Sequence, residues 1–215
     1  GNLDFAEDVM GKDIKPGDNV ISILPMAHMY GLAFEFIFEF VTGCHIYYLT
    51  RVPSPVVIAQ AFAEVKPRII IAVPLVIEKI IRKKVFPKIQ DTKIRLLMKM
   101  PGVNKKIFER INAQVSEAFG GNFYQIIVGG AAFNQEVESF LHQIGFKYTV
   151  GYGATECGPI IGYADYKEYV PGSCGKAALH MQVEIDSTDP RNIPGEIIVK
   201  GTNVMLGYYK NEEAT

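Results

Sequence analysis

"NFYQIIVGGAAFNQEVESFLHQIGFKYTVGYGATE", residues 122–156, contains one complete strand–helix–strand unit. The apolar run that ends at Val128 and the run "FKYTV" (146–150) are both typical of buried strands. Between them, Asn134 is placed to cap a helix that ends at Gly145. Each strand leads into a glycine-containing loop, and open α/β sheets bind ligands at the carboxyl ends of their parallel strands. The stretch therefore predicts a parallel sheet with two glycine loops at its binding edge.

The same alternation occurs earlier in the chain. Short apolar runs at 19–25, 44–50 and 68–73 are strand candidates, and a helix that begins at Ser54 with a proline in its first turn precedes the third run. Strands and helices at this spacing favour parallel pairing with right-handed crossovers. We also expect a helix over 29–43.

Two later regions have a different character. Residues 74–119 are helical in pattern, with breaks expected at Pro87 and Pro101-Gly102. After Glu156 the chain is made of short alternating runs between glycine and proline turns, which favour antiparallel β-structure: 171–185, 195–201 and 203–209. We predict an α/β protein with a largely parallel sheet flanked by helices, followed by an antiparallel β-rich segment. The expected division is 1–165 for the α/β subdomain and 166–215 for the β-rich start of the next.

Composition gives the chain the balance of a soluble globular protein. It has 215 residues, of which 48% are hydrophobic and 21% charged, and its net charge of -1 gives no case for binding nucleic acid. Three cysteines at spacings that match no zinc or redox pattern favour reduced thiols, and no signal peptide or bilayer-length apolar run is visible. The expected location is the cytoplasm.

The loop "GYGATE" (151–156) departs from a dinucleotide-binding loop at one position. Gly151 and Gly153 fit the Gly-x-Gly-x-x-Gly pattern, but Glu156 stands where the third glycine belongs. Two like charges about 4 Å apart repel by roughly 4 kcal/mol at an effective dielectric near 20, so this carboxylate opposes a bare phosphate. A magnesium ion between the two reverses the sign, while Tyr152 offers a face to a base and Thr155 a hydroxyl to a phosphate oxygen. The alternative is a tight turn with a solvated glutamate.

Several motifs together resemble the adenylate-forming (AMP-binding) superfamily. "GYGATE" resembles its Tyr-Gly-x-Thr-Glu signature, and "LPMAHMYG" (24–31), "VGGAAF" (128–133), "PGSCGKAA" (171–178) and the segment from 195 to 215 resemble four further motifs in the same order. The stretch 128–162 and the long helical insert are most similar to long-chain fatty acid-CoA ligases. The resemblance covers nearly the entire chain.

That resemblance implies ATP-dependent activation of a long-chain fatty acid to acyl-AMP, followed by transfer to coenzyme A. Glu156 is then expected to hold Mg²⁺, and Thr155 to bond the α-phosphate or the substrate carboxylate. His28 is expected at the pocket wall near the acyl carbonyl. Gly129, Gly130 and Ala131 are expected to line the adenine and acyl pockets, with Tyr152 against adenine. The second loop is expected to contribute the other cofactor-binding residues: Gly151, Gly153, Ala154 and Thr155.

The resemblance also implies parts that this sequence does not contain. The family's phosphate loop with its lysine, its ribose-binding Asp and its C-terminal domain with a catalytic Lys have no match here, so we expect an inactive fragment of a larger enzyme. The alternatives are adenylation of an aryl, shorter acyl or amino acid, or a non-catalytic nucleotide-binding protein. The amino-acid alternative is weakened because "LPMAHMYGLAF" (24–34) lacks an Asp.

Each candidate has an ordinary structural interpretation. His28 without the family context is more often structural, and His45, His142 and His180 are expected to be surface or core residues. Glu35 and Glu39 share one helix face, which we expect to be a solvated edge, with an acyl-tunnel role as the alternative.

The segment from Lys79 to Arg110 has eleven Lys or Arg against two acids, a net charge of +9. It offers a peripheral membrane contact or attraction for coenzyme A phosphates, with a solvated insert as the favoured interpretation.

Overall fold

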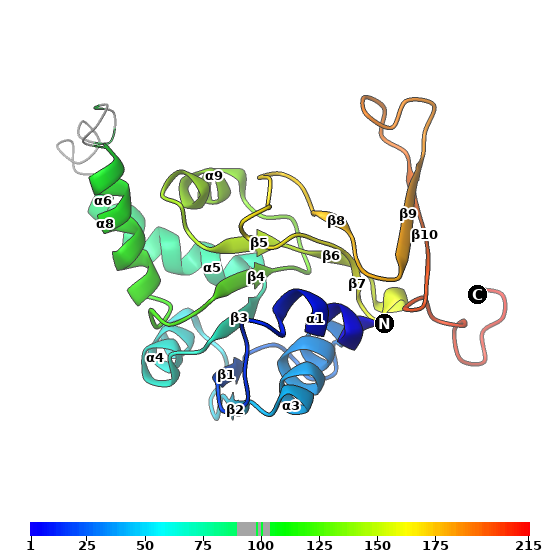
Figure 1. The fold of residues 1–215 in the computed structure, drawn as a ribbon, viewed down its shortest axis with the longest axis horizontal. Coiled ribbons are helices and arrows are strands. Elements are labelled where there is room, and N and C mark those ends of the chain that lie inside the picture. The colour runs from blue at the N-terminus through cyan, green and yellow to red at the C-terminus, as the bar shows by residue number, and fades with distance from the viewer. Residues whose placement is uncertain (90–97, 99, 101–103) are drawn as a thin grey trace.

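A computed structural model describes residues 1–89, 98, 100 and 104–215 (Figure 1). The α/β part contains, in chain order, α1 (Asn2–Met10), β1 (Asn19–Ser22), α2 (Met29–Gly31), the π-helix η1 (Leu32–Ile37), α3 (Phe38–Thr42), β2 (His45–Tyr48), α4 (Pro55–Val65), β3 (Ile69–Ala72), α5 (Pro74–Ile80), the π-helix η2 (Ile81–Val85), α6 (Phe86–Ile89), α8 (Asn104–Glu117), β4 (Gln125–Val128), α9 (Gln135–Gln143) and β5 (Tyr148–Val150). It is followed by β6 (Tyr152–Gly153), the 3₁₀ turn η3 (Thr155–Cys157), β7 (Ile160–Tyr163), β8 (Lys176–Ala177), β9 (Met181–Asp186) and β10 (Glu196–Gly201).

The parallel pairing expected from the sequence is confirmed. Strands β3, β4 and β5 form one parallel sheet in that order, and β1 and β2 form a second parallel pair. The backbone nitrogen of Arg68, directly before β3, donates to the carbonyl of Asn19 in β1 at 2.7 Å. The β1–β2 pair therefore lies beside the edge of the larger sheet.

The buried strands divide the core into two layers. Ile70 and Ala72 of β3 pack on one face with side chains from α4, α8 and α9, whereas Ile69 and Ile71 pack on the other with α1 and η1. Alternate residues of a strand point to opposite faces, so a strand that is apolar throughout needs helices on both sides. Figure 1 shows α9 on one side of the sheet and α1 and α3 on the other.

Local capping follows the sequence closely. The Ser54 side chain accepts from Val57 N at 3.3 Å at the start of α4, and Asn134 accepts from Val137 N at 3.2 Å at the start of α9. Gly43 ends α3 in the left-handed region with φ 81°. These contacts satisfy backbone groups that a helix end leaves unpaired.

The solvated edge expected for Glu35 and Glu39 is wrong. Both side chains are buried, with exposed fractions of 2% and 1%, while Phe40 and Val41 of the same helical stretch are 70% and 68% exposed. Glu35 points inward because it accepts hydrogen bonds from the end of β1, which supplies several donors at one place. One carboxylate oxygen of Glu39, Oε2, has no hydrogen-bond partner among the described residues.

Two further expectations need correction. Pro87 does not break the helix: α6 runs from Phe86 to Ile89, directly after the π-helix η2. In that wider turn Phe86 N donates to Ile81 O, five residues back, which makes room for a proline ring at the next position. Residues 203–209 form turns, bends and irregular backbone instead of a strand, and no described strand pairs with them. The break predicted at Pro101-Gly102 lies largely outside the described residues.

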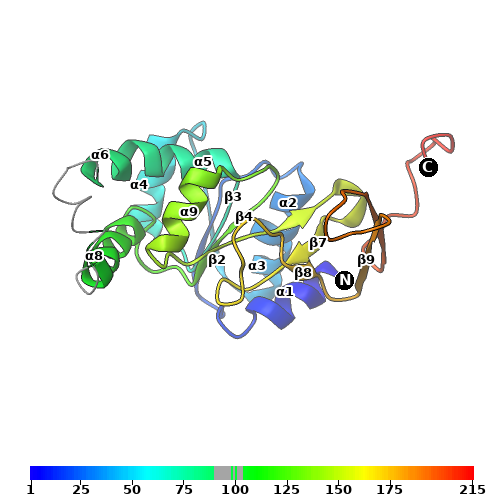
Figure 2. The ribbon, with the colours of Figure 1, turned by 90° about the horizontal axis from the view of Figure 1, so that it is seen from above.

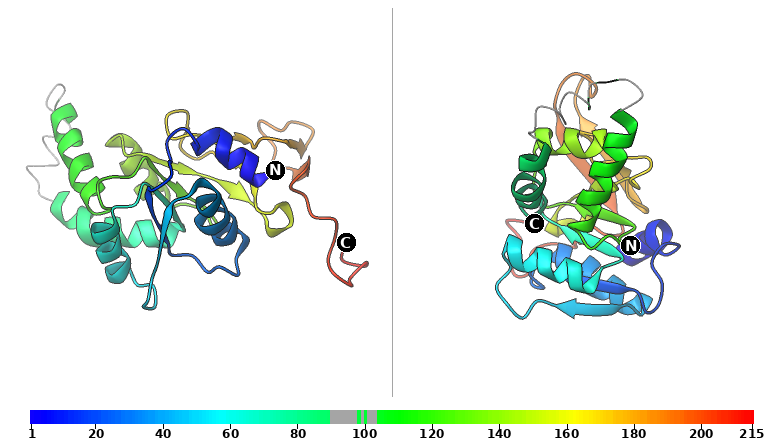
Figure 3. Two further views of the ribbon diagram at one scale, coloured as in Figure 1. Left: turned by 60° about the horizontal axis from the view of Figure 1, so that its bottom comes forward. Right: turned by 90° about the vertical axis from the view of Figure 1, so that its left-hand side faces the viewer.

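The C-terminal part is antiparallel, as expected. Strands β6, β7 and β8 form a three-stranded antiparallel sheet, and β9 and β10 form a hairpin with Glu196 opposite Asp186. Figures 1 and 2 show this hairpin at the end of the molecule opposite α6 and α8, and Figure 3 shows the C-terminal residues continuing beyond it.

The division at residue 165 stays a prediction. Within the described residues, no helix has the length and apolar character needed to span a bilayer.

Candidate functional site

Two cavities lie at the carboxyl ends of β4 and β5, against the two glycine loops. The inner cavity has a volume of about 220 Å³ and reaches into the core layer that contains Phe34 and Ile71. The outer cavity has a volume of about 490 Å³ and lies on the side of Phe133 and Tyr169. The wall that the cavities share is formed by Gly130, Gly151, Tyr152 and Gly153.

Two glycines that line the inner cavity, Gly129 and Gly153, are closely approached by other groups. A Cβ at Gly129 would lie 3.1 Å from the ring of Tyr30, whose hydroxyl donates to Ile127 O at 3.1 Å. A Cβ at Gly153 would lie 2.2 Å from the carbonyl oxygen of Pro159 on the neighbouring strand segment. The glycines therefore allow Tyr30 and the β6–β7 connection to seat against the loops.

The structure brings most of the predicted site residues together. His28, Gly129 and Gly130 line the inner cavity, together with Gly151, Tyr152, Gly153, Ala154 and Thr155 of the second loop. Ala131 instead lines the outer cavity. Glu156 is in neither lining, and lies in the 3₁₀ turn that begins at Thr155.

His28 has a structural partner as well as a place at the cavity. It is the N-cap of α2, and its Nδ1 atom accepts from Tyr30 N at 3.1 Å. Because Nδ1 is an acceptor, the neutral ring carries its hydrogen on Nε2, which makes Nε2 a donor for an anionic or carbonyl oxygen. The other histidines, His45, His142 and His180, are exposed.

Glu156 is held by residues that follow β10. Its Oε1 atom accepts from the hydroxyl of Tyr208 at 2.5 Å, and its backbone carbonyl accepts from Met205 N at 2.7 Å. The Tyr208 hydrogen bond lowers the pKa of Glu156, so the carboxylate is ionised at neutral pH. Sequence reasoning missed this contact, because no pattern links positions so far apart.

The Glu156 carboxylate could serve as one ligand of a magnesium ion. Among the described residues no group of three or more His, Cys, Asp and Glu side chains could hold a metal ion. Mg²⁺ is usually held by one or two carboxylates and completes its shell with phosphate oxygens and water. A single ionised carboxylate with one oxygen already fixed by a hydrogen bond meets that description.

Glu138 is buried at the outer cavity and accepts from Gly172 N at 2.9 Å and from the hydroxyl of Tyr169. The three cysteines are free thiols: Cys44, Cys157 and Cys174. Burial raises the pKa of Cys157, which disfavours the nucleophilic thiolate.

Two relatives that are named as acyl-CoA ligases or synthetases match this chain over nearly its whole length. It is 27% identical to long-chain-fatty-acid–CoA ligase 4 of Saccharomyces cerevisiae over 94% of this chain and 32% of that protein. It is 25% identical to long chain acyl-CoA synthetase 3 of Arabidopsis thaliana over 97% of this chain and 34% of that protein. The chain thus spans about a third of the length of these relatives.

Solved structures share the fold. The match to O-succinylbenzoate coenzyme A synthetase from Bacillus subtilis, in complex with ATP and magnesium ion, has a TM-score of 0.68 at 20% identity and covers 99% of this chain and 39% of that one. A benzoate CoA ligase from Burkholderia xenovorans gives 0.68 at 19% identity, with the same coverage of 99% and 39%. These matches confirm the expected α/β fold class. The model of the AMP-binding enzyme family matches residues 3–209, and the chain belongs to this family.

Proposed function

We propose that this chain is part of a ligase that activates a long-chain fatty acid with ATP and transfers the acyl group to coenzyme A. The observation that carries the proposal is an apolar inner cavity that opens beneath the loop with Tyr152 and Thr155. The names of the relatives support the same reaction. Because the chain spans about a third of their length, the activity is proposed for the whole protein.

The inner cavity is proposed to hold the acyl chain. Its walls include Phe5, Met10, Phe34 and Ile127, and burial of each CH₂ group in such surroundings is worth about 0.8 kcal/mol. The donor at Nε2 of His28 is then available to the oxygen of the acyl group. The apolar end and the polar mouth of one cavity suit a fatty acid.

The outer cavity and the shared wall are proposed to hold the nucleotide. Tyr152 is 39% exposed and offers an aromatic face to adenine, beside the open backbone of Gly130 and Ala131. Thr155 is exposed next to this wall, and its hydroxyl is available to donate to an oxygen of the α-phosphate. When bound to Glu156, Mg²⁺ supplies positive charge to the phosphate oxygens.

The chemistry then needs positioning more than acid–base catalysis. A carboxylate oxygen of the acid attacks the α-phosphorus, the bond from that phosphorus to the bridging oxygen of pyrophosphate breaks, and pyrophosphate leaves. Thr155 stabilises the negative charge that develops on the α-phosphate. In the second half-reaction the coenzyme A thiolate attacks the acyl carbonyl carbon, and AMP leaves.

A shorter or aryl acid is the second candidate substrate, and the cavity volume favours it. The inner cavity measures about 220 Å³, whereas ligand pockets typically measure about 300–1,000 Å³. The two candidates differ in a pyrophosphate-release assay of the full-length protein with benzoate and with saturated acids of increasing length. A rate that rises with chain length supports the fatty acid, and a maximum at benzoate or a short acid supports the alternative.

The role of Glu156 is tested in the same assay. Glu156→Gln is expected to lower the rate by about 100-fold at limiting magnesium, since the substitution removes an electrostatic contribution to the transition state. Glu184→Gln, an exposed glutamate on β9, is the matched control and should leave the rate unchanged. Equal rates and equal magnesium dependence in the two variants would remove Glu156 from the mechanism.

Membrane contact through Lys79–Arg110 and a cytoplasmic location stay predictions. Much of this segment lies outside the described residues. Within the described part, Lys79 and Lys83 are exposed, whereas Arg82 pairs with Glu136 at 2.8 Å. A liposome pull-down that shows no dependence on anionic lipid would argue against the membrane contact.

A further inference from the structure

Glu156 lies in a short turn that other parts of the chain hold from outside. The turn itself, η3, is a single 3₁₀ turn of three residues, Thr155–Cys157. Residues after β10 contact it twice, through Met205 N to the Glu156 carbonyl at 2.7 Å and through the Tyr208 hydroxyl to Glu156 Oε1 at 2.5 Å. One contact fixes the backbone and the other holds the Oε1 atom of the carboxylate.

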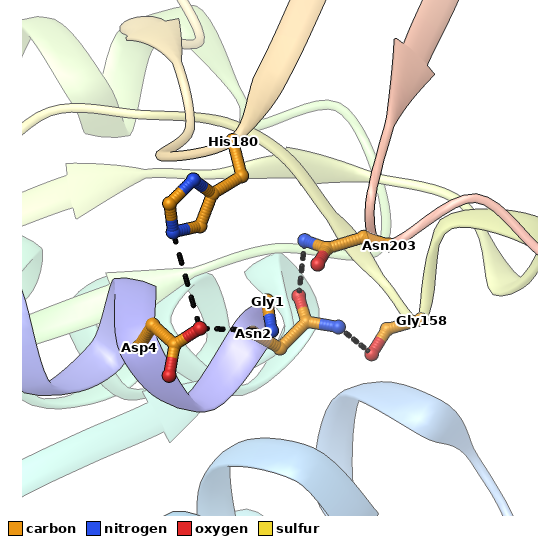
Figure 4. A network of polar contacts seen from close by, with 6 residues as sticks. All are labelled: Gly1, Asn2, Asp4, Gly158, His180 and Asn203. Atoms are coloured by element: carbon orange, nitrogen blue, oxygen red, sulfur yellow. Dashed lines mark hydrogen bonds and ion pairs between the residues drawn. The ribbon is translucent and has the colours of Figure 1, made fainter.

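The side chain of Asn2 connects the Glu156 turn to the segment that follows β10 (Figure 4). Asn2 is the first residue of α1, and its amide donates to the carbonyl of Gly158, directly after the turn. Its Oδ1 atom accepts from Ile160 N at 3.3 Å and from Asn203 Nδ2 at 3.1 Å. Asn203 belongs to the same segment as Met205 and Tyr208. The Asn2 side-chain amide therefore connects the two chain segments that meet at Glu156.

The backbone at Gly158 leaves space for the side-chain amide of Asn2. Gly158 has φ 65°, a conformation that favours glycine, and a Cβ there would lie 3.0 Å from Asn2 Nδ2. Helix α1 is held to the same region a second time, because Asp4 Oδ2 lies 3.9 Å from His180 Nε2 in the turn before β9 (Figure 4). The position of α1 and the position of the Glu156 turn are therefore linked.

We propose that Asn2 and Tyr208 are positioning residues for Glu156, and that together they keep its carboxylate in the orientation that binds the metal–nucleotide complex. This proposal rests on the function proposed above. Tyr208 acts directly on the carboxylate, whereas Asn2 acts through Asn203 and Gly158. A carboxylate that is already held in place loses less rotamer entropy when the ligand binds. The two residues would strengthen binding by lowering this entropy cost.

The test of Tyr208 measures the affinity of the full-length protein for Mn²⁺ in the presence of ATP, by electron paramagnetic resonance of the free ion. Tyr208→Phe removes one hydroxyl and is expected to weaken Mn²⁺ binding about 10-fold. Tyr209→Phe is the matched control, because Tyr209 is 88% exposed and makes no hydrogen bond through its side chain to another described residue. In a Glu156→Gln background, Tyr208→Phe should have no further effect.

The outcomes separate this proposal from the proposed function. If Glu156→Gln weakens Mn²⁺ binding but Tyr208→Phe matches Tyr209→Phe, the positioning role is overturned and the proposed function stands. Additive effects of Tyr208→Phe and Glu156→Gln would also overturn it, because Tyr208 would then act elsewhere. If Glu156→Gln itself binds Mn²⁺ and ATP normally, the metal role of Glu156 fails and the positioning role fails with it.

Asn2 is tested by amide hydrogen exchange on the 215-residue chain and by the same Mn²⁺ measurement. Asn2→Ala is expected to speed exchange of the Met205 amide and to weaken Mn²⁺ binding several-fold, whereas Asn192→Ala in the β9–β10 connection should do neither. If Asn2→Ala prevents folding, Asn203→Ala removes one contact only and takes its place. Unchanged Met205 exchange together with unchanged Mn²⁺ affinity would contradict the role of Asn2.

Discussion

The Oε2 atom of Glu35 lies 2.8 Å from the backbone nitrogen of Leu24, so a helix side chain completes the hydrogen bonding at the end of strand β1. The same atom accepts from Ile23 N at 3.1 Å and from the Ser22 hydroxyl at 3.1 Å. Burial raises the pKa of Glu35 to about 7 even though these donors lower it. One carboxyl group therefore ties η1 to the strand that precedes it.

The first prediction concerns the pH dependence of folding. Burial raises the pKa of Glu39 to about 7; the hydrogen bond from Cys44 opposes this rise, and the charges of Glu35 and Asp18 add to it. Between the ordinary pKa of 4.5 and about 7 the folded chain keeps these protons while the unfolded chain loses them, so stability falls as pH rises through that window. Glu39→Gln is expected to stabilise the chain by about 1–3 kcal/mol at about pH 8 and to flatten this slope.

Urea unfolding at about pH 5 and about pH 8 measures this effect. Glu184→Gln, on an exposed position of β9, provides the control and should keep the slope of the parent chain. A slope that survives in Glu39→Gln unchanged would show that the carboxyl of Glu39 does not retain its proton in the folded state.

The second prediction compares two glycines of the shared wall. Gly153→Ala places a Cβ 2.2 Å from Pro159 O and must push β6 away from β7, which we expect to destabilise the chain by about 2–3 kcal/mol. A Cβ at Gly151 would lie 3.6 Å from its nearest neighbours, so Gly151→Ala should cost less than about 1 kcal/mol. Thermal melts of both variants decide the point, and equal melting temperatures would contradict it.

The third prediction concerns the floor of the inner cavity. Phe34 is 4% exposed and meets the rings of Phe5 and Tyr30 edge to face, with centroids 6.4 Å and 6.2 Å away. Phe34→Ala should cost about 3–5 kcal/mol of stability and enlarge the cavity. Under the proposed function it should also shift the preferred acid to a longer chain in the pyrophosphate-release assay. Phe40→Ala, at a position 70% exposed, should change neither property.

The fourth prediction tests the nucleotide role proposed for the aromatic ring of Tyr152. Tyr152→Ala is expected to weaken ATP binding by about 1–3 kcal/mol, the range found when an aromatic partner of a base is removed. Tyr152→Phe keeps the ring and should bind ATP like the parent. Isothermal titration of the full-length protein provides the measurement, and an alanine variant with parental affinity would place adenine elsewhere.

What the sequence could predict was mostly local. Ser54 and Asn134 cap their helices because a cap needs only the next few residues, and the strands before the two glycine loops followed from short apolar runs. Gly151 and Thr155 line the same cavity because the carboxyl ends of parallel strands lie at one edge of the sheet. The motifs therefore identified residues that the structure brings to one cavity.

What the sequence could not predict depends on distant partners. Glu35 is buried because donors converge at the end of β1, and helix periodicity does not contain that information. The same holds for Tyr208, which is 52 positions from Glu156, and for Asn2, which is 156 positions from Gly158. The local sequence of residues 203–209 favours a strand, but a strand also needs a neighbouring strand to pair with, and the local sequence does not show whether one is present.

The two cavities share a layer of lining residues from the two glycine loops, and this gives the site a thermodynamic property. A ligand on one side rests against Gly130 and Gly151, whose other side belongs to the second cavity. Any displacement of this layer by the first ligand changes the space left for the second. Under the proposed function, with the acid in one cavity and the nucleotide in the other, the resulting change in affinity is the same whichever ligand binds first, so binding of the two ligands is reciprocally coupled.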